Sequence, residues 1–298
     1  MIADIDRHGA SLVGLSVAGV PCVQGFPVDA DPPLSAGIVM APWPNRIRDG
    51  RWRQGDNDHQ LVITEPDKNN AIHGLSARAT WEVTHLGASS VTLRHSIRDE
   101  PGYPFNVELE VTYTLTHSGI DVVHRAINTS DRPAPFAAGA HPYLRVGNDS
   151  LEDATVTVPA SIRFVSDSRK LPLGQKELSG ETEDLREGRT VSDLDVDITY
   201  RLNGSGPWQS VLAGKKHTVT VWQEKPLCYM HVFTTRLFPS ESGPSTAIAM
   251  EPTTAPGDSF NSGEGLTWLV PNTPWHANWG IRVDQTRAVA SDQLHALM

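Results

Sequence analysis

Cysteine is scarce in this sequence, and long apolar runs and amphipathic helices longer than two turns are missing from it. Cys22 and Cys228 are the only cysteines. One pair so far apart gives no disulfide framework, so we expect two free, mostly buried thiols. No apolar run approaches the ~18 residues that a membrane span requires. These absences exclude a disulfide-stapled scaffold and a helical membrane protein.

Positive charge is also in short supply. Lys and Arg number 25 against 35 for Asp and Glu, which gives a formal net charge of −10 at pH 7. No basic run is available for phosphates or an anionic membrane, so neither nucleic acid nor a membrane is an expected partner. The start, MIADIDRHGA, has no basic segment followed by an apolar one. The sequence therefore predicts a soluble, cytoplasmic protein.

Turn formers, in contrast, are abundant: 22 prolines and 24 glycines separate short apolar segments. The clearest alternation of apolar residues covers 105–115 and resumes at 120–124, which predicts an antiparallel pair with one buried face. Other expected strands are two in 11–23, a hairpin in 51–63, and 81–86, 91–97, 154–159, 217–223, 228–234, 246–250 and 267–270.

This pattern predicts an all-β protein with two packed antiparallel sheets and a concave face. The length of 298 residues suits one β-sandwich, so we expect a single domain over 1–298. Two segments do not fit the strand pattern. Residues 166–189 are expected to form a long polar excursion, and 287–298 a short terminal helix.

Glu251 stands where the strand expected at 246–250 meets two prolines and a glycine. A carboxylate at such a boundary can face an open cleft. Taken alone, Glu251 is more simply explained as an acidic residue in a solvated loop, because loops usually lie at the surface.

Four short strings in order carry a family resemblance. They are Pro44-Asn45-Arg46-Ile47, Asn70-Ala71-Ile72-His73-Gly74, Gly139-Ala140-His141-Pro142-Tyr143, and EPTTAPGDSFNSGEGL from Glu251 onward. Together they cover about residues 40 to 280, and the chain resembles the aldose 1-epimerase (mutarotase) family over a whole domain. The resemblance implies the large antiparallel β-sandwich of the galactose mutarotase type.

The resemblance also implies a reaction, the interconversion of α and β anomers of an aldose. A base must take the proton of the anomeric hydroxyl while an acid protonates the ring oxygen, and we expect the two on opposite sides of the sugar. Glu251 matches the family's base. His141 suits the acid, since imidazole titrates near neutral pH and the following Pro142 favours an extended backbone. No cofactor and no metal are needed.

Three further residues are expected to bind the sugar. Arg46 matches the family's substrate-binding arginine, and His73 would lie in the same pocket. The family's aspartate falls in an acidic stretch with several candidates, of which we choose Asp195 and keep Asp197 in reserve. Aromatic side chains also suit a sugar site, although burial in the core is the default for Trp43, Trp52, Trp81, Tyr143 and Trp222.

Departures from the family pattern bear on the substrate. Residues 41–48 read APWPNRIR, and Leu144-Arg145-Val146 follow His141-Pro142-Tyr143, where many galactose mutarotases differ. Both differences put galactose in doubt as the substrate. The partner is expected to be a monosaccharide, either glucose, galactose or an acidic sugar such as a sulfonated hexose, for which Arg48 and Arg145 are candidates. The protein is expected to be a monomer or a homodimer.

Two other classes of function remain open at this point. His73, His141 and Glu251 would make a two-His-one-carboxylate metal site, but no close-spaced ligand pair such as H-x-H or HExxH supports it. A non-catalytic sugar-binding or sugar-sensing protein would keep Arg46, Asp195 and the aromatic residues, and would have no use for Glu251 beside His141.

Overall fold

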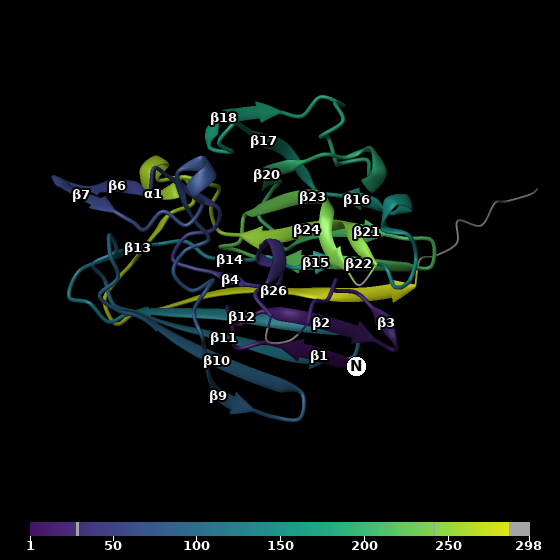
Figure 1. The fold of residues 1–298 in the computed structure, drawn as a ribbon, viewed down its shortest axis with the longest axis horizontal. Coiled ribbons are helices and arrows are strands. Elements are labelled where there is room, and N and C mark those ends of the chain that lie inside the picture. The colour runs from purple at the N-terminus through teal and green to yellow at the C-terminus, as the bar shows by residue number, and fades with distance from the viewer. Residues whose placement is uncertain (28–29, 241, 286–298) are drawn as a thin grey trace, which may run out of the picture.

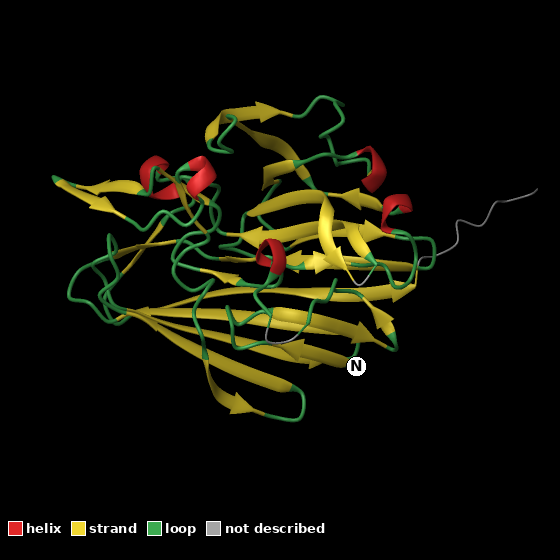
Figure 2. Ribbon diagram, viewed as in Figure 1, coloured by secondary structure: helices red, strands yellow, loops and turns green. Residues whose placement is uncertain are grey.

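The computed structural model describes residues 1–27, 30–240 and 242–285, and within them strands dominate (Figures 1 and 2). The helix expected at 287–298 lies outside the described residues. The described helical turns are short: α1 (Ser259–Ser262), η1 (Pro33–Ser35), η2 (Pro66–Lys68), η3 (Leu151–Asp153) and η4 (Val191–Asp193). The all-β prediction is confirmed.

Two large sheets form the layers of the molecule (Figure 1). The nine-stranded sheet runs in the order β19 (Arg189–Thr190), β16 (Thr155–Thr157), β21 (Trp208–Ala213), β22 (His217–Gln223), β26 (Pro274–Gln285), β12 (Gly119–Asn128), β11 (Val107–Thr116), β10 (Ser90–Ile97) and β9 (Glu82–Leu86). The eight-stranded sheet runs in the order β18 (Pro172–Glu177), β17 (Ala160–Ser166), β20 (Asp197–Leu202), β23 (Tyr229–Ser240), β24 (Gly243–Thr253), β14 (Gly139–Ala140) and β4 (Val39–Met40), with β15 (Tyr143–Leu144) also paired to β24.

Smaller sheets surround these layers. They are β1 (Ile2–Ile5) with β2 (Leu12–Val17) and β3 (Val20–Pro21), the pair β5 (Arg46–Arg48) and β8 (Asn70–Ile72), the hairpin β6 (Arg51–Gln54) and β7 (Asn57–Gln60), and the pair β13 (Ala134–Phe136) and β25 (Thr267–Leu269). Cys22 is buried, Cys228 is half-buried and both are free thiols.

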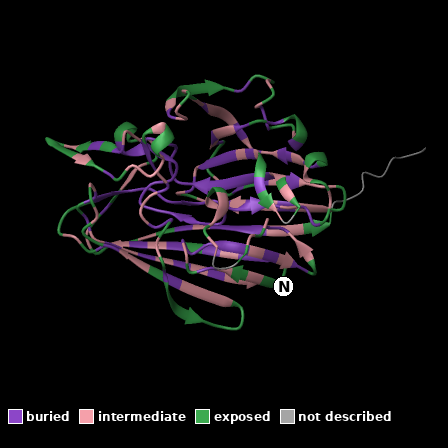
Figure 3. Ribbon diagram, viewed as in Figure 1, coloured by how far each residue is buried: buried purple, intermediate pink, exposed green. Residues whose placement is uncertain are grey.

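The core lies between the two large sheets, where buried residues line the facing strands (Figure 3). One cluster of buried apolar side chains extends from Ala10 to Ile281 and includes Val122 of the nine-stranded sheet and Met250 of the eight-stranded sheet. Removal of this much apolar surface from water is the main source of stability for such a fold. The alternation predicted at 105–115 is confirmed from Val107 to Tyr113, where the apolar residues of β11 are buried and the polar ones between them are half-buried; Leu115 is half-buried.

The structure corrects the expectation of a long polar excursion at 166–189. β18 lies within it and pairs antiparallel with β17, from Ile162 opposite Glu177 to Ser166 opposite Pro172. β18 is an edge strand whose residues are almost all exposed, so its sequence shows no alternation of apolar and polar residues. The strands β17, β20 and β21 are also absent from the expected strands.

Candidate active site

A row of polar side chains crosses adjacent strands of the eight-stranded sheet. Thr199 of β20 lies opposite His231 of β23, and His231 lies opposite Glu251 of β24. Because successive side chains of a strand alternate between faces, Met250 points into the core while Glu251 points away from it. The row therefore lies on the outer face of this sheet.

His141 extends the same row beyond Glu251. Gly139 of β14 lies opposite Thr253 and Tyr143 of β15 lies opposite Ala249, so the register between them places His141 opposite Glu251. His141 Nε2 lies 3.3 Å from Glu251 Oε1, and the two residues are only 4% and 1% exposed. The structure brings these two predicted residues together. Their arrangement differs from the expectation, because they stand side by side instead of on opposite sides of a bound sugar.

His231 was not anticipated as a site residue. Its Nε2 lies 3.1 Å from Asp197 Oδ1 and 4.0 Å from Glu251 Oε1, and its Nδ1 lies 2.8 Å from Thr199 Oγ1. An ionised carboxylate can only accept a hydrogen bond, so Nε2 carries a hydrogen in this arrangement. The histidine stands inside a segment that was correctly expected to be a strand, and no motif distinguished it there.

Asp197 takes the position in the cleft that the sequence assigned first to Asp195. Asp195 is exposed and does not line the cleft, because it precedes β20 and lies outside the sheet. Asp197 lies 3.5 Å from Lys170 Nζ and 3.9 Å from Arg46 Nη1, in addition to its contact with His231. Lys170 comes from the loop between β17 and β18, within the segment expected to be a polar excursion.

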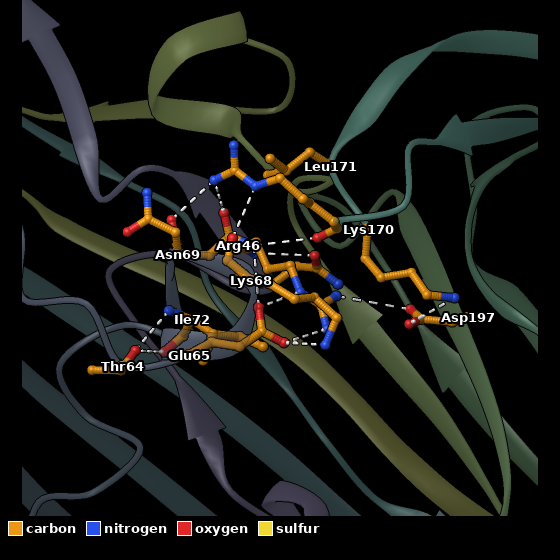
Figure 4. A network of polar contacts seen from close by, with 12 residues as sticks. Arg46, Thr64, Glu65, Lys68, Asn69, Ile72, Lys170, Leu171 and Asp197 are labelled. Carbon is orange, nitrogen blue, oxygen red and sulfur yellow. Dashed lines mark hydrogen bonds and ion pairs between the residues drawn. The ribbon is translucent and has the colours of Figure 1, made fainter.

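Arg46 is held by Glu65 in a two-pronged contact (Figure 4). Its Nε and Nη2 donate hydrogen bonds of 2.8 and 2.9 Å to the two carboxylate oxygens of Glu65. Lys68 Nζ and Asn70 Nδ2 donate to the same carboxylate at 3.1 Å each. Such a bidentate arginine–carboxylate pair fixes the plane of the guanidinium. Arg46, predicted as a sugar-binding residue, thus lies in the cleft with its orientation set by Glu65.

His73 packs edge-on against His141, with ring centroids 5.3 Å apart. Its backbone has a φ of +62°, and Gly74 follows with a φ of +76°. A Cβ at Gly74 would lie 2.1 Å from the carbonyl oxygen of Ala41, so only glycine fits this turn. The turn aims the His73 ring at the row. The Nδ1 atoms of His73 and His141 are buried without hydrogen-bond partners in the described part of the chain.

These side chains line a cleft of about 460 Å³. Its lining residues are Leu34, Ser35, Asn45, Arg46, Glu65, Lys68, Ile72, His73, His141, Lys170, Asp197, His231, Phe233 and Glu251. A volume of this size suits a small-molecule ligand. The cleft adjoins a second hollow of about 540 Å³, which reaches His8 and Arg78 and shares four lining residues with the cleft: Leu34, Ser35, Ile72 and His73.

Several candidates from the sequence lie elsewhere. Of the aromatic residues, Trp43, Trp81 and Tyr143 are fully buried in the packed interior, and none of the five named candidates lines the cleft. Phe233 is the aromatic residue that does. Arg48 and Arg145 are also outside the cleft lining, and Arg48 pairs with Asp258 at 3.3 Å.

The local environment shifts the pKa values of the histidines in different directions. Burial lowers the pKa of His141 although Glu251 opposes this, and burial lowers the pKa of His73 well below its ordinary value. Burial would also lower the pKa of His231, but the carboxylates of Glu251 and Asp197 outweigh it and raise the pKa. Glu251 lies closer to His141, at 3.3 Å, than to His231, at 4.0 Å. The pKa of His231 is nevertheless the raised one, because His231 faces two carboxylates.

The carboxylates beside cations shift the other way. Burial opposes ionisation of Asp197, but its contacts with His231, Arg46 and Lys170 hold the pKa below the usual range. The pKa of Glu65 is likewise lowered, since Arg46 outweighs the effect of burial.

In the described residues no three His, Cys, Asp or Glu side chains are grouped so that they could hold a metal ion. The metal site considered from His73, His141 and Glu251 therefore gains no support there. None of the helices between residues 1 and 285 that the structure describes is long and apolar enough to cross a membrane.

Several known proteins resemble this chain. A family model described as aldose 1-epimerase matches residues 1–282. A protein of Escherichia coli (strain K12), described as "Uncharacterized protein YihR", is 28% identical over 273 residues, which are 91% of this chain and 87% of that protein. The maltose epimerase of Levilactobacillus brevis is 32% identical over 152 residues, 47% of this chain and 44% of that enzyme.

A solved structure shows the same fold. A galactose mutarotase-like protein from Clostridium acetobutylicum superposes with a TM-score of 0.82 at 21% identity, covering 95% of this chain and 92% of that one. At this identity the likeness concerns the fold alone. The predicted β-sandwich of the galactose mutarotase type is confirmed.

Proposed function

Because this chain belongs to the aldose 1-epimerase family, we propose that it interconverts the α and β anomers of a free hexose or a hexose derivative. One observation carries the proposal: Glu251 Oε1 and His141 Nε2 stand 3.3 Å apart in the wall of a sugar-sized cleft. A base and an acid in adjacent positions suit a hemiacetal, because the anomeric hydroxyl and the ring oxygen are bonded to the same carbon.

The reaction follows from this arrangement. The Glu251 carboxylate takes the proton of the anomeric hydroxyl while the bond between C1 and the ring oxygen breaks. The ring oxygen takes the proton from Nε2 of protonated His141, whose charged form the neighbouring Glu251 carboxylate favours. The open aldehyde turns about its C1–C2 bond and closes from the other face, and both protons return to where they began. Atoms and charge therefore balance without a cofactor.

The remaining cleft residues would hold the sugar. Arg46, fixed by Glu65, offers donors to sugar hydroxyls, and Asp197 offers an acceptor on the neighbouring strand. His73 lies against His141, where it can keep the acid's ring in place. Phe233 gives the cleft an apolar surface on which a pyranose face can pack.

The proposal is tested by polarimetry on freshly dissolved sugars. The panel contains α-glucose, α-galactose, maltose and an acidic hexose, since Lys68 and Lys170 lie at the cleft and a second hollow adjoins it. We expect equilibration of at least one sugar to be much faster than in buffer. Rates equal to buffer for every sugar would favour a sugar-binding protein and overturn the enzyme assignment.

Two substitutions test the assigned roles. We expect Glu251→Gln and His141→Asn each to lower turnover by at least ~100-fold, which is typical for loss of a positioned acid or base. Near-isosteric replacements keep the packing of the wall, and circular dichroism checks that both variants fold. Nearly full activity in either variant would refute the role of that residue.

A further inference from the structure

His231 has no part in the reaction described so far, although it occupies the centre of the polar row. We propose that His231 is a positioning residue for this reaction: it holds Asp197 toward the cleft and keeps a positive charge beside the Glu251 carboxylate. This inference rests on the proposed function in one respect, since it takes Glu251 to be the base.

Strand pairing puts His231 between the two carboxylates. β23 is the strand between β20, which carries Asp197, and β24, which carries Glu251. Side chains directly opposite each other on neighbouring strands lie within contact distance. His231 is therefore the cross-strand neighbour of Glu251 on one side and of Thr199 on the other, and its ring reaches Asp197 diagonally.

The contacts of the imidazole leave it one stable orientation. Thr199 Oγ1 lies 2.8 Å from Nδ1, and Asp197 Oδ1 lies 3.1 Å from Nε2. Both ring nitrogens are thus occupied, whereas Nδ1 of His141 has no partner in the described part of the chain. His231 is 6% exposed, so solvent cannot replace these contacts. The ring can act on Asp197 and Glu251 from a fixed place.

Titratable groups from five segments of the chain face this ring. Glu251 on β24 and Asp197 on β20 favour its protonated form, and Arg46 on β5 opposes it. The neighbouring imidazoles of His73 and His141 lie within electrostatic reach. The carboxylates outweigh the rest, and the raised pKa of His231 agrees with a positive charge between them.

A residue that only fills space would behave differently from one that supplies charge. Loss of a filler would lower activity at every pH without moving the pH profile. Loss of a cation 4.0 Å from Glu251 makes the carboxylate easier to protonate, so the acid limb of kcat/KM moves to higher pH. At this separation the expected movement is about one pH unit or more.

The experiment compares His231→Gln with the wild type in two measurements. The first is the pH profile of kcat/KM for the sugar that the wild type equilibrates. The second is the titration of the Glu251 carboxyl ¹³C signal by NMR, identified by its disappearance in Glu251→Gln. We expect both midpoints to rise by about one pH unit or more in the variant, and KM to rise because Asp197 loses its contact with the imidazole. Unchanged midpoints would overturn the proposal.

Phe233→Leu provides the matched control for the carboxyl titration, because Phe233 is two residues further along β23 on the same face and carries no charge. We expect no shift of the Glu251 signal in this variant; an equal shift would count against a charge effect. Should His231→Gln fail to fold, Thr199→Val removes the contact at Nδ1 and keeps the ring. A smaller upward shift then supports the proposal, and its absence overturns it.

The two proposals fail in different ways. If the wild type equilibrates no sugar, the epimerase function falls, while the carboxyl titration still decides whether His231 acts on Glu251. If the wild type is active and the midpoints of His231→Gln do not move, the function stands and only the role of His231 falls.

Discussion

At the scale of single residues, the site depends on which of two nearby aspartates faces the cleft. Asp195 and Asp197 have the same parity along the chain, yet only Asp197 belongs to β20, and Asp195 precedes the strand in an exposed position. The acidic stretch itself contains nothing that separates them. The distinction comes from His231, Lys170 and Arg46, which arrive from three other segments and surround Asp197.

Asp197→Asn should show how much the interactions of Asp197 with these three residues contribute to stability. The pKa of Asp197 is lowered in the folded state, so its stabilising effect is fully present above the unfolded aspartate pKa of ~3.9 and is lost as pH falls further. We expect the variant to be less stable by about 2 kcal/mol at pH 7. The difference in unfolding free energy between the wild type and the variant should be smaller by about 1 kcal/mol at pH 3, measured by urea unfolding.

Asp195→Asn is the control for this measurement, because Asp195 is exposed. We expect its stability to match the wild type within about 0.5 kcal/mol at both pH values. A gap for Asp197→Asn that stays constant between pH 7 and pH 3 would show that ionisation of Asp197 does not stabilise the fold.

At the scale of elements, the strands of the row were largely predictable and their pairing was not. The segments 228–234 and 246–250 show clear apolar patterns, so β23 and β24 could be located. Counting back from the turn, where Ser240 lies opposite Gly243, would place Val232 opposite Glu251. An irregularity between Thr235 and Phe238 shifts the register by one residue and brings His231 there instead. No pattern in the sequence indicates that shift.

Unlike the strand pairing, the site residues that stand in motif strings could be predicted from the sequence. Glu251, His141, Arg46 and His73 stand in strings that resemble a family, and the structure brings all four to one cleft. Lys170 and Glu65 stand in no such string. Lys170 is delivered by the β17–β18 loop, where Arg169 donates hydrogen bonds of 2.9 Å to the carbonyl oxygen of Lys68 and 2.7 Å to Asp49. Contacts between segments a hundred residues apart leave no local signature.

The turn after β8 provides a test at this scale. Gly74→Ala would place a Cβ 2.1 Å from the Ala41 carbonyl oxygen at a φ of +76°. Backbone must move to relieve this overlap, so we expect a loss of about 3 kcal/mol or more in thermal or urea unfolding. Because His73 precedes the glycine, KM for the sugar should rise as well.

Gly55→Ala is the matched control, since Gly55 also has a positive φ of +57° but an added Cβ would meet nothing within 4 Å. It should cost only the conformational strain of about 1 kcal/mol. Equal losses in the two variants would contradict the role of the Ala41 contact.

At the scale of the whole molecule, the cleft and the core occupy opposite faces of the same sheet. Met250 and Val232 join the core cluster between the two sheets, while Glu251 and His231 point to the cleft. The core thus supports the row from behind without sharing its polar side chains. Conservative changes in the row are therefore expected to alter function more than folding.

The core itself contains one buried histidine that should govern acid stability. His124 of β12 is 4% exposed and accepts a hydrogen bond of 2.8 Å from the indole nitrogen of Trp279 on β26. Burial lowers the pKa of His124 to about 4. Between the ordinary histidine pKa of ~6.5 and this value the unfolded chain binds a proton that the folded chain does not, so stability falls as pH falls.

His124→Gln should remove this dependence. The variant is expected to be less stable than the wild type at pH 7, because the glutamine packs less well, and the gap should close by about 2 kcal/mol at pH 4.5 in urea unfolding. His85→Gln, a change at an exposed histidine of β9, should leave the pH dependence as it is. If the stability difference between His124→Gln and the wild type were equal at both pH values, protonation of His124 would not be the cause of the loss of stability in acid.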